Sequence, residues 1–338
     1  MISIGIDLGG SKIEIIALDR QRRECYRKRI PSPQKSYSDT LAALCQLIRE
    51  AESQLACRAS IGVGLPGSID RHSGKVKNAN STWINGRTLK KDLEERLDRT
   101  IKVENDANCF VLSEVLDGAG RDSQSVFGVI LGTGCGGGFY HRGQLLTGAM
   151  GLGGEWGHNP LPFPLSYFPS KDVEQDLLEF FGQGATVERS EIYRHKPLPT
   201  YTTNLLAYSE YPGPLCYCGK RGCLETWISG RGLERDYQRQ TQRELSAEAI
   251  AAAATSGNER AQMCLNRYCE RLAKSLAQVI NILDPEKIVL GGGMSNVSLL
   301  YEKVPELWKT YIFSDTTTTQ LVPAHHGDAS GVRGAALL

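Results

Sequence analysis

Apolar and β-branched residues open the chain on both sides of a short glycine turn. The apolar runs at 2–7 and 13–18 are too short for helices, so we predict a β-hairpin, followed by a third strand at 24–30. The pattern returns later, where an apolar run at 126–131 leads into a second glycine-rich turn and further apolar residues. Two similar hairpins in one chain predict two similar domains that face one cleft.

Between and after the hairpins, apolar positions alternate between the helical and the extended period. The expected elements are helices at 41–55 and 89–97, a helix ending at 116, helices at 265–283 and 328–338, and strands at 61–65, 101–103 and 288–290. Alternation of buried strands with helices is typical of an α/β protein. We therefore predict two α/β domains. The smaller comprises residues 1–117 with the closing helix at about 328–338, and the larger comprises residues 118–327.

A stretch at about 160–215 does not follow this pattern. It contains eight of the fourteen prolines, and only 172–181 has the spacing of a short helix. A loop-rich insert of this length in a compact domain is usually functional or an interaction surface, and a poorly ordered insert is the alternative. The sequence leaves both interpretations open.

Composition adds constraints on partners and location. Of the 338 residues, 41% are hydrophobic and 23% charged, and the formal net charge of +1 favours neither nucleic acid nor an anionic membrane as a partner. No apolar run is long enough to cross a bilayer, and the first strand begins at Ile2 with no leader-like segment before it. We expect a cytoplasmic protein whose scattered cysteines are reduced.

Both glycine turns lie between strands, and this order disfavours two common nucleotide-binding folds. Residues 132–137 formally match G-x-G-x-x-G, but Walker and dinucleotide-binding loops run from a strand into a helix whose amides hold the phosphate. Here each turn leads into another strand. The backbone amides of the two turns could still hold a polyphosphate between two domains. A third glycine turn, at 291–293, would let a flat ring approach the backbone.

Three cysteines, Cys216, Cys218 and Cys223, lie within eight residues, and the glycines between them permit a tight knuckle. Thiolates at this spacing are typical of a zinc site, and a tetrahedral site needs a fourth ligand, for which His158 is the candidate. A disulfide or free thiols are the alternatives, and a reducing cytosol disfavours the disulfide. With four protein ligands the zinc would be structural and would brace the residues around it.

Asn105 and Asp106 follow the strand at 101–103 and precede an apolar helix. Because Asn and Asp are favoured helix caps, a structural N-cap is one interpretation of Asp106. The other is catalytic, since open α/β sheets place their chemistry at the carboxyl ends of strands. The residues alone leave the choice open.

With these segments identified, the chain resembles the ROK family (repressors, open reading frames and kinases) over its whole length. The motifs that carry the resemblance are Asp7-Leu-Gly-Gly-Ser-Lys12, Glu104-Asn-Asp-Ala-Asn108, Gly132-Thr-Gly-Cys-Gly-Gly-Gly138, Gly154-Glu-Trp-Gly-His158, Cys216-x-Cys218-x4-Cys223-x-Glu225, Gly291-Gly-Gly-Met-Ser295 and His326-Gly-Asp-Ala-Ser-Gly-Val-Arg-Gly334. The resemblance implies a two-domain actin/hexokinase-like (ribonuclease H-like) α/β fold with a structural zinc knuckle. The stretch between Pro162 and Cys216 is longer than is usual in the family, so lid geometry and oligomer contacts do not carry over.

The resemblance also implies roles in ATP-dependent phosphorylation of a hexose. Asp106 would be the general base that takes the proton from the attacking hydroxyl. The sugar hydroxyls would be held by Asn80, Asn105, Asp106, Glu155, His158 and Glu225. ATP would be bound by Gly9, Gly10, Ser11 and Lys12, by Gly132, Thr133 and Gly134, and by Gly291, Gly292 and Gly293. Asp7 would orient Mg²⁺, and His158, Cys216, Cys218 and Cys223 would hold Zn²⁺. A homodimer is left open.

Two loops, Lys77-Asn-Ala-Asn-Ser-Thr-Trp83 and Gly157-His-Asn-Pro-Leu-Pro162, resemble the bacterial fructokinase and mannokinase branch. We therefore expect phosphorylation of D-fructose at O6, with mannose accepted less well, and an N-acetylglucosamine kinase or glucokinase as the alternative. A sugar-sensing transcriptional repressor of the same family is disfavoured, because no helix-turn-helix fits ahead of the strand at Ile2. A filament-forming actin relative would not explain the zinc knuckle or the pair Asn105 and Asp106.

Overall fold

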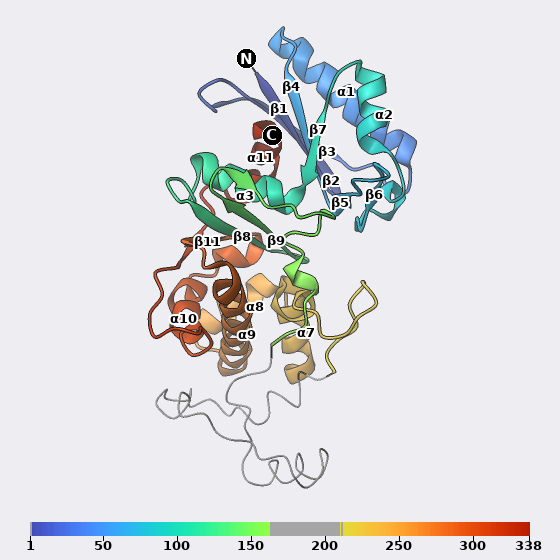
Figure 1. The fold of residues 1–338 in the computed structure, drawn as a ribbon. Helices are drawn as coiled ribbons and strands as arrows, with labels where there is room; N and C mark the ends of the chain where they lie inside the picture. The colour runs from blue at the N-terminus through green and yellow to red at the C-terminus, as the bar shows by residue number, and fades with distance from the viewer. Residues whose placement is uncertain (1, 163–209, 211) are drawn as a thin grey trace, which may run out of the picture. The chain divides into compact units, whose positions relative to one another are not determined.

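The computed structural model describes residues 2–162, 210 and 212–338 (Figure 1). Their contacts divide the chain into unit 1, which comprises Met1–Gly157, Pro285–Asn296 and Thr319–Leu338, and unit 2, which comprises His158–Asp284 and Val297–Thr318. The helix expected at 172–181 lies outside the described residues. Both predicted hairpins fall in unit 1. The domain boundary predicted near residue 117 stays a prediction.

Unit 1 contains two five-stranded sheets that share one topology, with the orders β3-β2-β1-β4-β7 and β10-β9-β8-β11-β12. In each sheet, three antiparallel strands are followed by two parallel ones. The first sheet is formed by β1 (Ser3–Leu8), β2 (Lys12–Leu18), β3 (Glu24–Pro31), β4 (Ser60–Leu65) and β7 (Lys102–Asn105). The second is formed by β8 (Ser125–Leu131), β9 (Cys135–His141), β10 (Gln144–Leu145), β11 (Lys287–Gly291) and β12 (Gln320–Pro323). Each predicted glycine hairpin therefore begins one sheet.

The helices of unit 1 cover these sheets. They are α1 (Tyr37–Leu55), α2 (Leu89–Leu97), α3 (Asp106–Asp117) and α11 (Ser330–Leu337). Unit 1 also has 3₁₀ turns at Thr82–Ile84, Gly293–Asn296 and Gly327–Ala329 and a small hairpin of β5 (Ser68–Ile69) and β6 (Val76–Lys77), and a 3₁₀ turn at Trp156–His158 leads along the chain into unit 2. Ile4, Ile6 and Leu8 on β1 are fully buried in a core that also includes Leu41 and Leu44 of α1. This burial follows from the alternation of side chains along a strand, and Figure 1 shows α1 and α2 together beside the first sheet.

The other face of the first sheet packs against α11, and α11 also crosses α3. A Cβ atom added at Gly62 of β4 would lie only 1.9 Å from the carbonyl oxygen of Ala335, and one at Gly334 would lie 1.7 Å from that of Cys109 in α3. Only glycine permits backbones to approach this closely. The two glycines therefore lock the closing helix between the sheet and α3.

Unit 2 is helical in its described part and contains α6 (Glu225–Ile228), α7 (Gly230–Thr241), α8 (Ala247–Thr255), α9 (Glu259–Leu283) and α10 (Leu299–Trp308). The apolar stripe that predicted a helix at 265–283 belongs to α9, which begins earlier because the Asn258 side chain accepts a hydrogen bond from the Ala261 N–H. The helix ends at Asp284, a left-handed residue directly before Pro285, as the sequence predicts.

A buried ion network anchors α9. Arg271 and Lys274 are almost completely buried, and both donate to the Glu210 carboxylate at 2.7 Å. Arg271 also lies 3.4 Å from the buried Asp236 of α7, and its guanidinium stacks over the Trp227 ring of α6 at 4.6 Å. Buried charges are tolerated only when they are paired, so this network ties Glu210, α6, α7 and α9 together.

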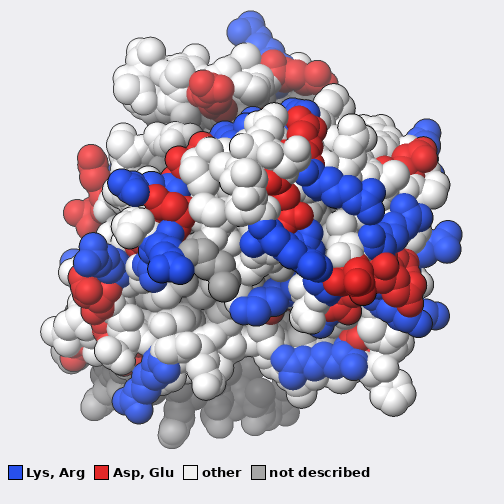
Figure 2. All heavy atoms as spheres, turned by 90° about the horizontal axis from the view of Figure 1, so that it is seen from above, with Lys and Arg blue, Asp and Glu red and all other residues white. Residues whose placement is uncertain are grey.

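The surface in Figure 2 carries lysine and arginine side chains intermingled with aspartate and glutamate. This mixture matches the net charge of +1. Among the described residues, no helix combines the length and the apolar character needed to cross a membrane.

Candidate active site

The first glycine turn joins β1 to β2 and is closed by a hydrogen bond of 2.9 Å from the Gly9 N–H to the Lys12 carbonyl. A Cβ atom added at Gly10 would lie 3.2 Å from Ser81 Oγ and 3.8 Å from Asn80 Oδ1. The turn that was predicted to bind phosphate therefore lies next to Asn80, which was predicted to hold the sugar. Glycine at this position keeps the space between them open.

The two other predicted nucleotide turns also come together. In the turn between β8 and β9, the Gly132 N–H donates to the Gly134 carbonyl at 3.1 Å, with Thr133 at the tip. Gly292 has a left-handed φ of 77°, and a Cβ atom there would lie 2.6 Å from the Leu131 carbonyl oxygen and 3.0 Å from the Gly132 nitrogen. The Gly291–Gly293 turn therefore packs against the start of the Gly132–Gly134 turn.

The helix cap belongs to Asn105 rather than to Asp106. The Asn105 Oδ1 accepts hydrogen bonds from the N–H groups of Ala107 and Asn108 at 2.9 and 3.3 Å, and its Nδ2 donates to the Gly67 carbonyl at 2.7 Å. Asp106 is the first residue of α3 itself. The capping interpretation of Asp106 is therefore wrong, because a neighbouring side chain already fills that role.

Asp106 lies at the helix N-terminus among other carboxylates. Burial, followed by the charges of Asp7 and Glu155, outweighs a hydrogen bond from the Ala107 N–H and raises the pKa of Asp106 to about 7. Burial and the charge of Glu14 likewise raise the pKa of Asp7 to about 6. Acidic groups held close together in a desolvated site resist ionisation until a proton or a cation compensates them. A carboxylate with a pKa near neutrality is suited to general-base catalysis.

Glu14 is a charged residue of this region that the sequence motifs did not identify. It stands directly opposite Asp7 in the β1–β2 register and is only 2% exposed. Arg27 and Arg29 of β3 each donate to its carboxylate at 2.6 Å. The available signal was a single acidic residue between isoleucines in a buried strand, since strand alternation places it on the same face as Asp7.

Glu155 is positioned by the turn that contains it. Its N–H donates to the Leu152 carbonyl at 3.2 Å, and the next side chain, Trp156, donates from Nε1 to the Gly136 carbonyl at 3.1 Å. A Cβ atom at Gly137 would lie 2.7 Å from the Trp156 indole, so the glycines of β9 make room for that ring. The glycine-rich strand thus fixes the turn that presents Glu155.

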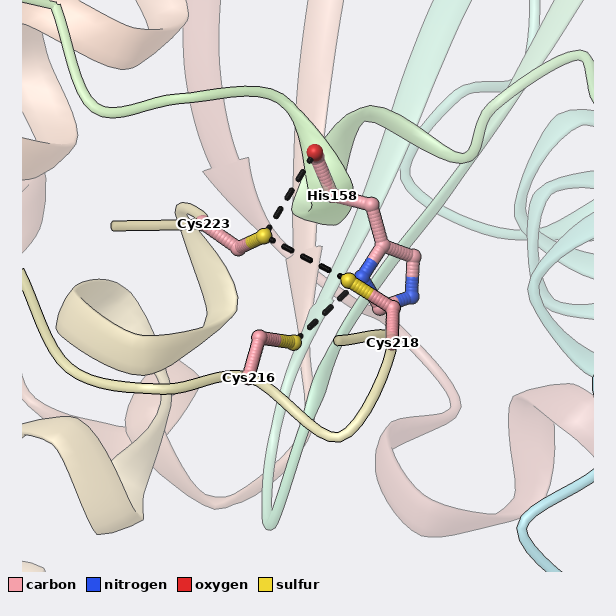
Figure 3. Close-up of side chains that lie close together, drawn as sticks. All are labelled: His158, Cys216, Cys218 and Cys223. Carbon is pink, nitrogen blue, oxygen red and sulfur yellow. Dashed lines mark hydrogen bonds between the residues drawn. The ribbon is translucent and has the colours of Figure 1, made fainter. Parts of the chain in front are cut away.

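In unit 2, His158 and the three knuckle cysteines gather around one point (Figure 3). Their potential ligand atoms all lie within 4.8 Å of one another. The Sγ atoms of Cys218 and Cys223 are 3.6 Å apart, and Cys216 Sγ lies 3.7 Å from His158 Nδ1. No disulfide joins the three knuckle cysteines, since the sulfurs of Cys218 and Cys223 are too far apart for a bond.

These distances suit a tetrahedral metal site. With metal–sulfur bonds of about 2.3 Å, neighbouring ligands of a tetrahedron stand about 3.8 Å apart. Burial and the neighbouring thiols raise the pKa of Cys223 well above its ordinary value, because three thiolates cannot share this space without a cation. The donor set therefore fits Zn²⁺ in its chemistry and in its spacing.

Directly after the knuckle comes Glu225, one of the residues predicted to hold the sugar. Glu225 is the first residue of α6, and its Oε1 lies 4.0 Å from Cys216 Sγ. The Tyr268 hydroxyl donates to the Ile228 carbonyl at 2.5 Å and fixes the other end of α6. Tyr217, which sequence reasoning missed, lies with its hydroxyl 3.1 Å from His158 Nε2.

Within unit 1, Asp7 and Glu155 lie close enough to Asp106 for their charges to raise its pKa. Asn80 lies beside the first turn, and the second and third turns pack against each other. Within unit 2 the structure gathers Glu225 with the four predicted zinc ligands. The roles assigned to these residues stay predictions, and the geometry says which of them are neighbours.

Comparison with known proteins extends this description to the whole chain. The model of the ROK family matches residues 3–338. N-acetyl-D-glucosamine kinases of Shigella boydii serotype 4 and Escherichia coli O1:K1 are 35% and 34% identical over 334 residues, covering 99% of this chain and 98% of each relative. A ROK hexokinase from Thermus thermophilus superimposes with a TM-score of 0.78 at 28% identity, covering 100% of this chain and 97% of its own.

The expected affinity to the fructokinase and mannokinase branch is not confirmed by these comparisons, because the curated relatives named above are N-acetylglucosamine kinases. The actin/hexokinase-like α/β fold is confirmed, since the match to the hexokinase spans the whole chain. Because the family model and the kinase relatives both cover nearly every residue, the chain belongs to the ROK family, among its sugar kinases.

Proposed function

We propose that this protein is an N-acetyl-D-glucosamine kinase that transfers the γ-phosphoryl group of ATP to the 6-hydroxyl of the sugar. The observation that carries the reaction is Asp106, a desolvated carboxylate relieved of the cap role by Asn105, with its pKa raised to about 7. The choice of sugar is supported by the 35% identity to N-acetyl-D-glucosamine kinases over 99% of the chain. The comparisons favour this sugar over the fructose expected from the two loops.

In the proposed mechanism Asp106 accepts the proton of the 6-hydroxyl as that oxygen attacks the γ-phosphorus. A carboxylate of ordinary pKa would be a weak base, and burial beside Asp7 makes Asp106 a better acceptor near neutral pH. Phosphoryl transfer depends on positioning and charge neutralisation more than on covalent chemistry. The three glycine turns supply backbone amides for the phosphates and space for the adenosine.

The carboxylate cluster fits a divalent cation, because Asp7 and Asp106 lie in a desolvated site where the charge of Asp7 disfavours ionisation of Asp106. Asp7 would hold Mg²⁺ there. Bound Mg²⁺ supplies neutralisation of the charge that develops on the transferred phosphoryl group.

The side chains proposed to hold the sugar are those of Asn80, Asn105, Glu155, His158 and Glu225. For Asn105, the observed bonds use one hydrogen of its amide nitrogen, and the second can reach a sugar hydroxyl. For His158, Nδ1 faces the cysteine sulfurs, so with a metal on Nδ1 the proton stays on Nε2. Nε2–H then donates to the Tyr217 hydroxyl or to a sugar oxygen.

The Cys₃His cluster is proposed to hold a structural Zn²⁺ that fixes Glu225 at the start of α6. Four protein ligands leave no vacant position for a substrate, so the metal serves the fold rather than the chemistry.

An ADP-release assay with N-acetylglucosamine, glucose, mannose and fructose tests the proposal. We expect the highest kcat/KM for N-acetylglucosamine, and mass spectrometry of the product should place the phosphate on O6. A higher kcat/KM for fructose would reinstate the fructokinase interpretation, and no ATP-dependent phosphorylation of any sugar would overturn the mechanism.

A further inference from the structure

The segment that leads from β9 to Glu155 has little packing of its own. None of the residues from 142 to 154 is buried, and the first buried residue after β9 is Trp156. Within this loop the Gly153 N–H donates to the Thr147 carbonyl at 3.0 Å, and the Glu155 N–H donates to the Leu152 carbonyl at 3.2 Å. A segment with few buried contacts opens easily. The position of Glu155 therefore depends on what holds the loop from outside.

Two cations of the β5–β6 hairpin reach this loop. Arg71 Nη2 donates to Thr147 Oγ1 at 2.5 Å, and Lys77 Nζ donates to the Met150 carbonyl at 3.0 Å. Contacts near the surface are individually weak. Because these two come from one hairpin and meet the loop at separate points, together they restrict both its position and its orientation.

The hairpin that carries the two cations is itself well fixed. Its turn is closed by Asp70, whose Oδ1 accepts hydrogen bonds from the N–H and the hydroxyl of Ser73, both at 2.9 Å. These two bonds hold the pKa of Asp70 down to about 2, so the carboxylate stays charged at neutral pH. The Asp70 N–H also donates to the Lys75 carbonyl at 2.9 Å. Arg71 therefore projects from an ordered turn.

The same hairpin is connected to two other residues proposed to hold the sugar. Its first strand follows Gly67, whose carbonyl accepts a hydrogen bond of 2.7 Å from the Asn105 side chain. Its second strand ends at Lys77, shortly before Asn80 in the chain. The two ends of the hairpin lie in close contact, since a Cβ atom added at Gly67 would be 2.3 Å from the Lys77 carbonyl oxygen. Asn80, Asn105 and the Glu155 loop are thus all attached to one small hairpin.

We propose that Arg71 and Lys77 are positioning residues for sugar binding, which hold the Glu155 loop in a fixed place relative to Asn80 and Asn105. This inference rests on the proposed function, because it requires these three side chains to contact the sugar. Neither cation is assigned a contact with the sugar itself. A site that is ordered in advance binds more tightly, since the cost of ordering is not taken from the binding free energy. Loss of the two cations should therefore weaken sugar binding and leave the phosphoryl-transfer step intact.

The test uses Lys77→Met, Arg71→Met and the double variant, with N-acetylglucosamine as the sugar. The matched control is Lys75→Met, an exposed cation of the same hairpin whose ammonium makes no hydrogen bond to any residue that the structure describes. Each single variant should raise both KM and the calorimetric Kd for the sugar about threefold to tenfold, the value of one hydrogen bond, with kcat within about twofold of wild type. The double variant should raise them further. Lys75→Met should match wild type, and Lys77→Arg, which keeps a donor, should restore most of the affinity.

Hydrogen exchange followed by mass spectrometry gives a readout that does not depend on turnover. Without sugar, the amides of residues 146–155 should exchange faster in the double variant than in wild type, because the loop has lost its outside attachments. If wild type phosphorylates N-acetylglucosamine and the double variant keeps its KM and Kd, this inference is overturned and the proposed function stands, even if the variant melts at a lower temperature. If wild type does not phosphorylate N-acetylglucosamine, the proposed function falls and the inference falls with it.

Discussion

The two sheets of unit 1 share strand order and direction, yet charged residues are concentrated in only one of them. The first hairpin carries Asp7, Lys12 and Glu14, whereas the stretch from Ser125 to Tyr140 in the second contains no charged residue. The helices that follow the last strands differ in the same way. The helix after β7 begins with the desolvated Asp106, and the helix after β12 begins with Ser330, whose hydroxyl is fully bonded.

This difference shows how one topology serves two purposes. In the second sheet the glycine turns offer backbone amides without charged side chains, which suits recognition of a nucleotide. In the first sheet the same framework holds carboxylates whose pKa values burial raises. The connection between the third and fourth strands also differs, since α1 fills it in the first sheet and unit 2 with the cysteine knuckle fills it in the second.

The largest effect is expected from a substitution among the carboxylates of the first sheet. Asp106→Asn keeps the shape of the side chain but cannot accept a proton, so kcat should fall by about 10²–10⁴ with sugar affinity changed only several-fold. Steady-state kinetics and calorimetric binding of the sugar measure the two quantities. A variant that kept nearly the wild-type kcat would show that Asp106 is not the base.

The next prediction concerns the cysteine knuckle, which lies in the connection between the third and fourth strands of the second sheet. Purified protein should contain about one zinc per chain, and Cys218→Ala should lose both the metal and the activity, because the segment carrying Glu225 depends on its ion. Metal analysis by mass spectrometry is the measurement. Cys25→Ala, an exposed cysteine on β3, is the control that should keep both. Active wild-type protein without zinc would contradict this assignment.

A smaller effect appears in the stability of the protein in Mg²⁺-free buffer. The pKa of Asp106 is about 7 in the folded protein and has a reference value of 3.8, so between these values the folded state binds the extra proton. The stability contributed by protonated Asp106 is therefore lost as pH rises towards and beyond 7. Asp106→Asn should melt several degrees above wild type at pH 8, and the gap should close towards pH 4. A gap that does not depend on pH would mean that the pKa of Asp106 is not raised.

The smallest effect on activity is expected at the corresponding position of the second helix. Ser330 Oγ donates to the fully buried Glu114 at 2.7 Å, and the N–H groups of Ala119, His325 and His326 donate to the same carboxylate. Ser330→Ala should lower the free energy of unfolding by about 1.5–3 kcal/mol, the value of a hydrogen bond to a charged group, with kcat almost unchanged. Denaturant titration measures the first and the ADP assay the second. A large loss of kcat would remove the contrast between the two helix starts.

The sequence predicts those features that depend on local spacing. The glycine hairpins and the long helix α9 follow from periodicity, and the cysteine spacing calls for a fourth zinc ligand, for which the sequence offers His158. The choice between Asn105 and Asp106 as the cap could not be made, because both side chains suit it equally. It is decided by the Gly67 carbonyl, which is distant in sequence and holds the Asn105 amide. The strands β5 and β6 have two residues each, too few for any alternation to reveal.

The sugar preference was beyond local patterns for a related reason. The loops that resembled the fructokinase branch surround Asn80 and His158, residues predicted to contact hydroxyls that many hexoses share. Contacts to hydroxyls that many hexoses share do not distinguish one sugar from another.

The ion network of unit 2 sets a limit for anyone who would shorten this protein. Glu210 is the acceptor for both Arg271 and Lys274, and it comes from the far end of the long proline-rich insert. A deletion that stops before Glu210 leaves the two cations with their partner. A deletion that includes Glu210 leaves the buried charges of Arg271 and Lys274 without this partner, and breaking a buried ion pair costs about 3–5 kcal/mol of stability. A shortened protein should therefore keep Glu210, and this one carboxylate sets the end of the segment that can be deleted.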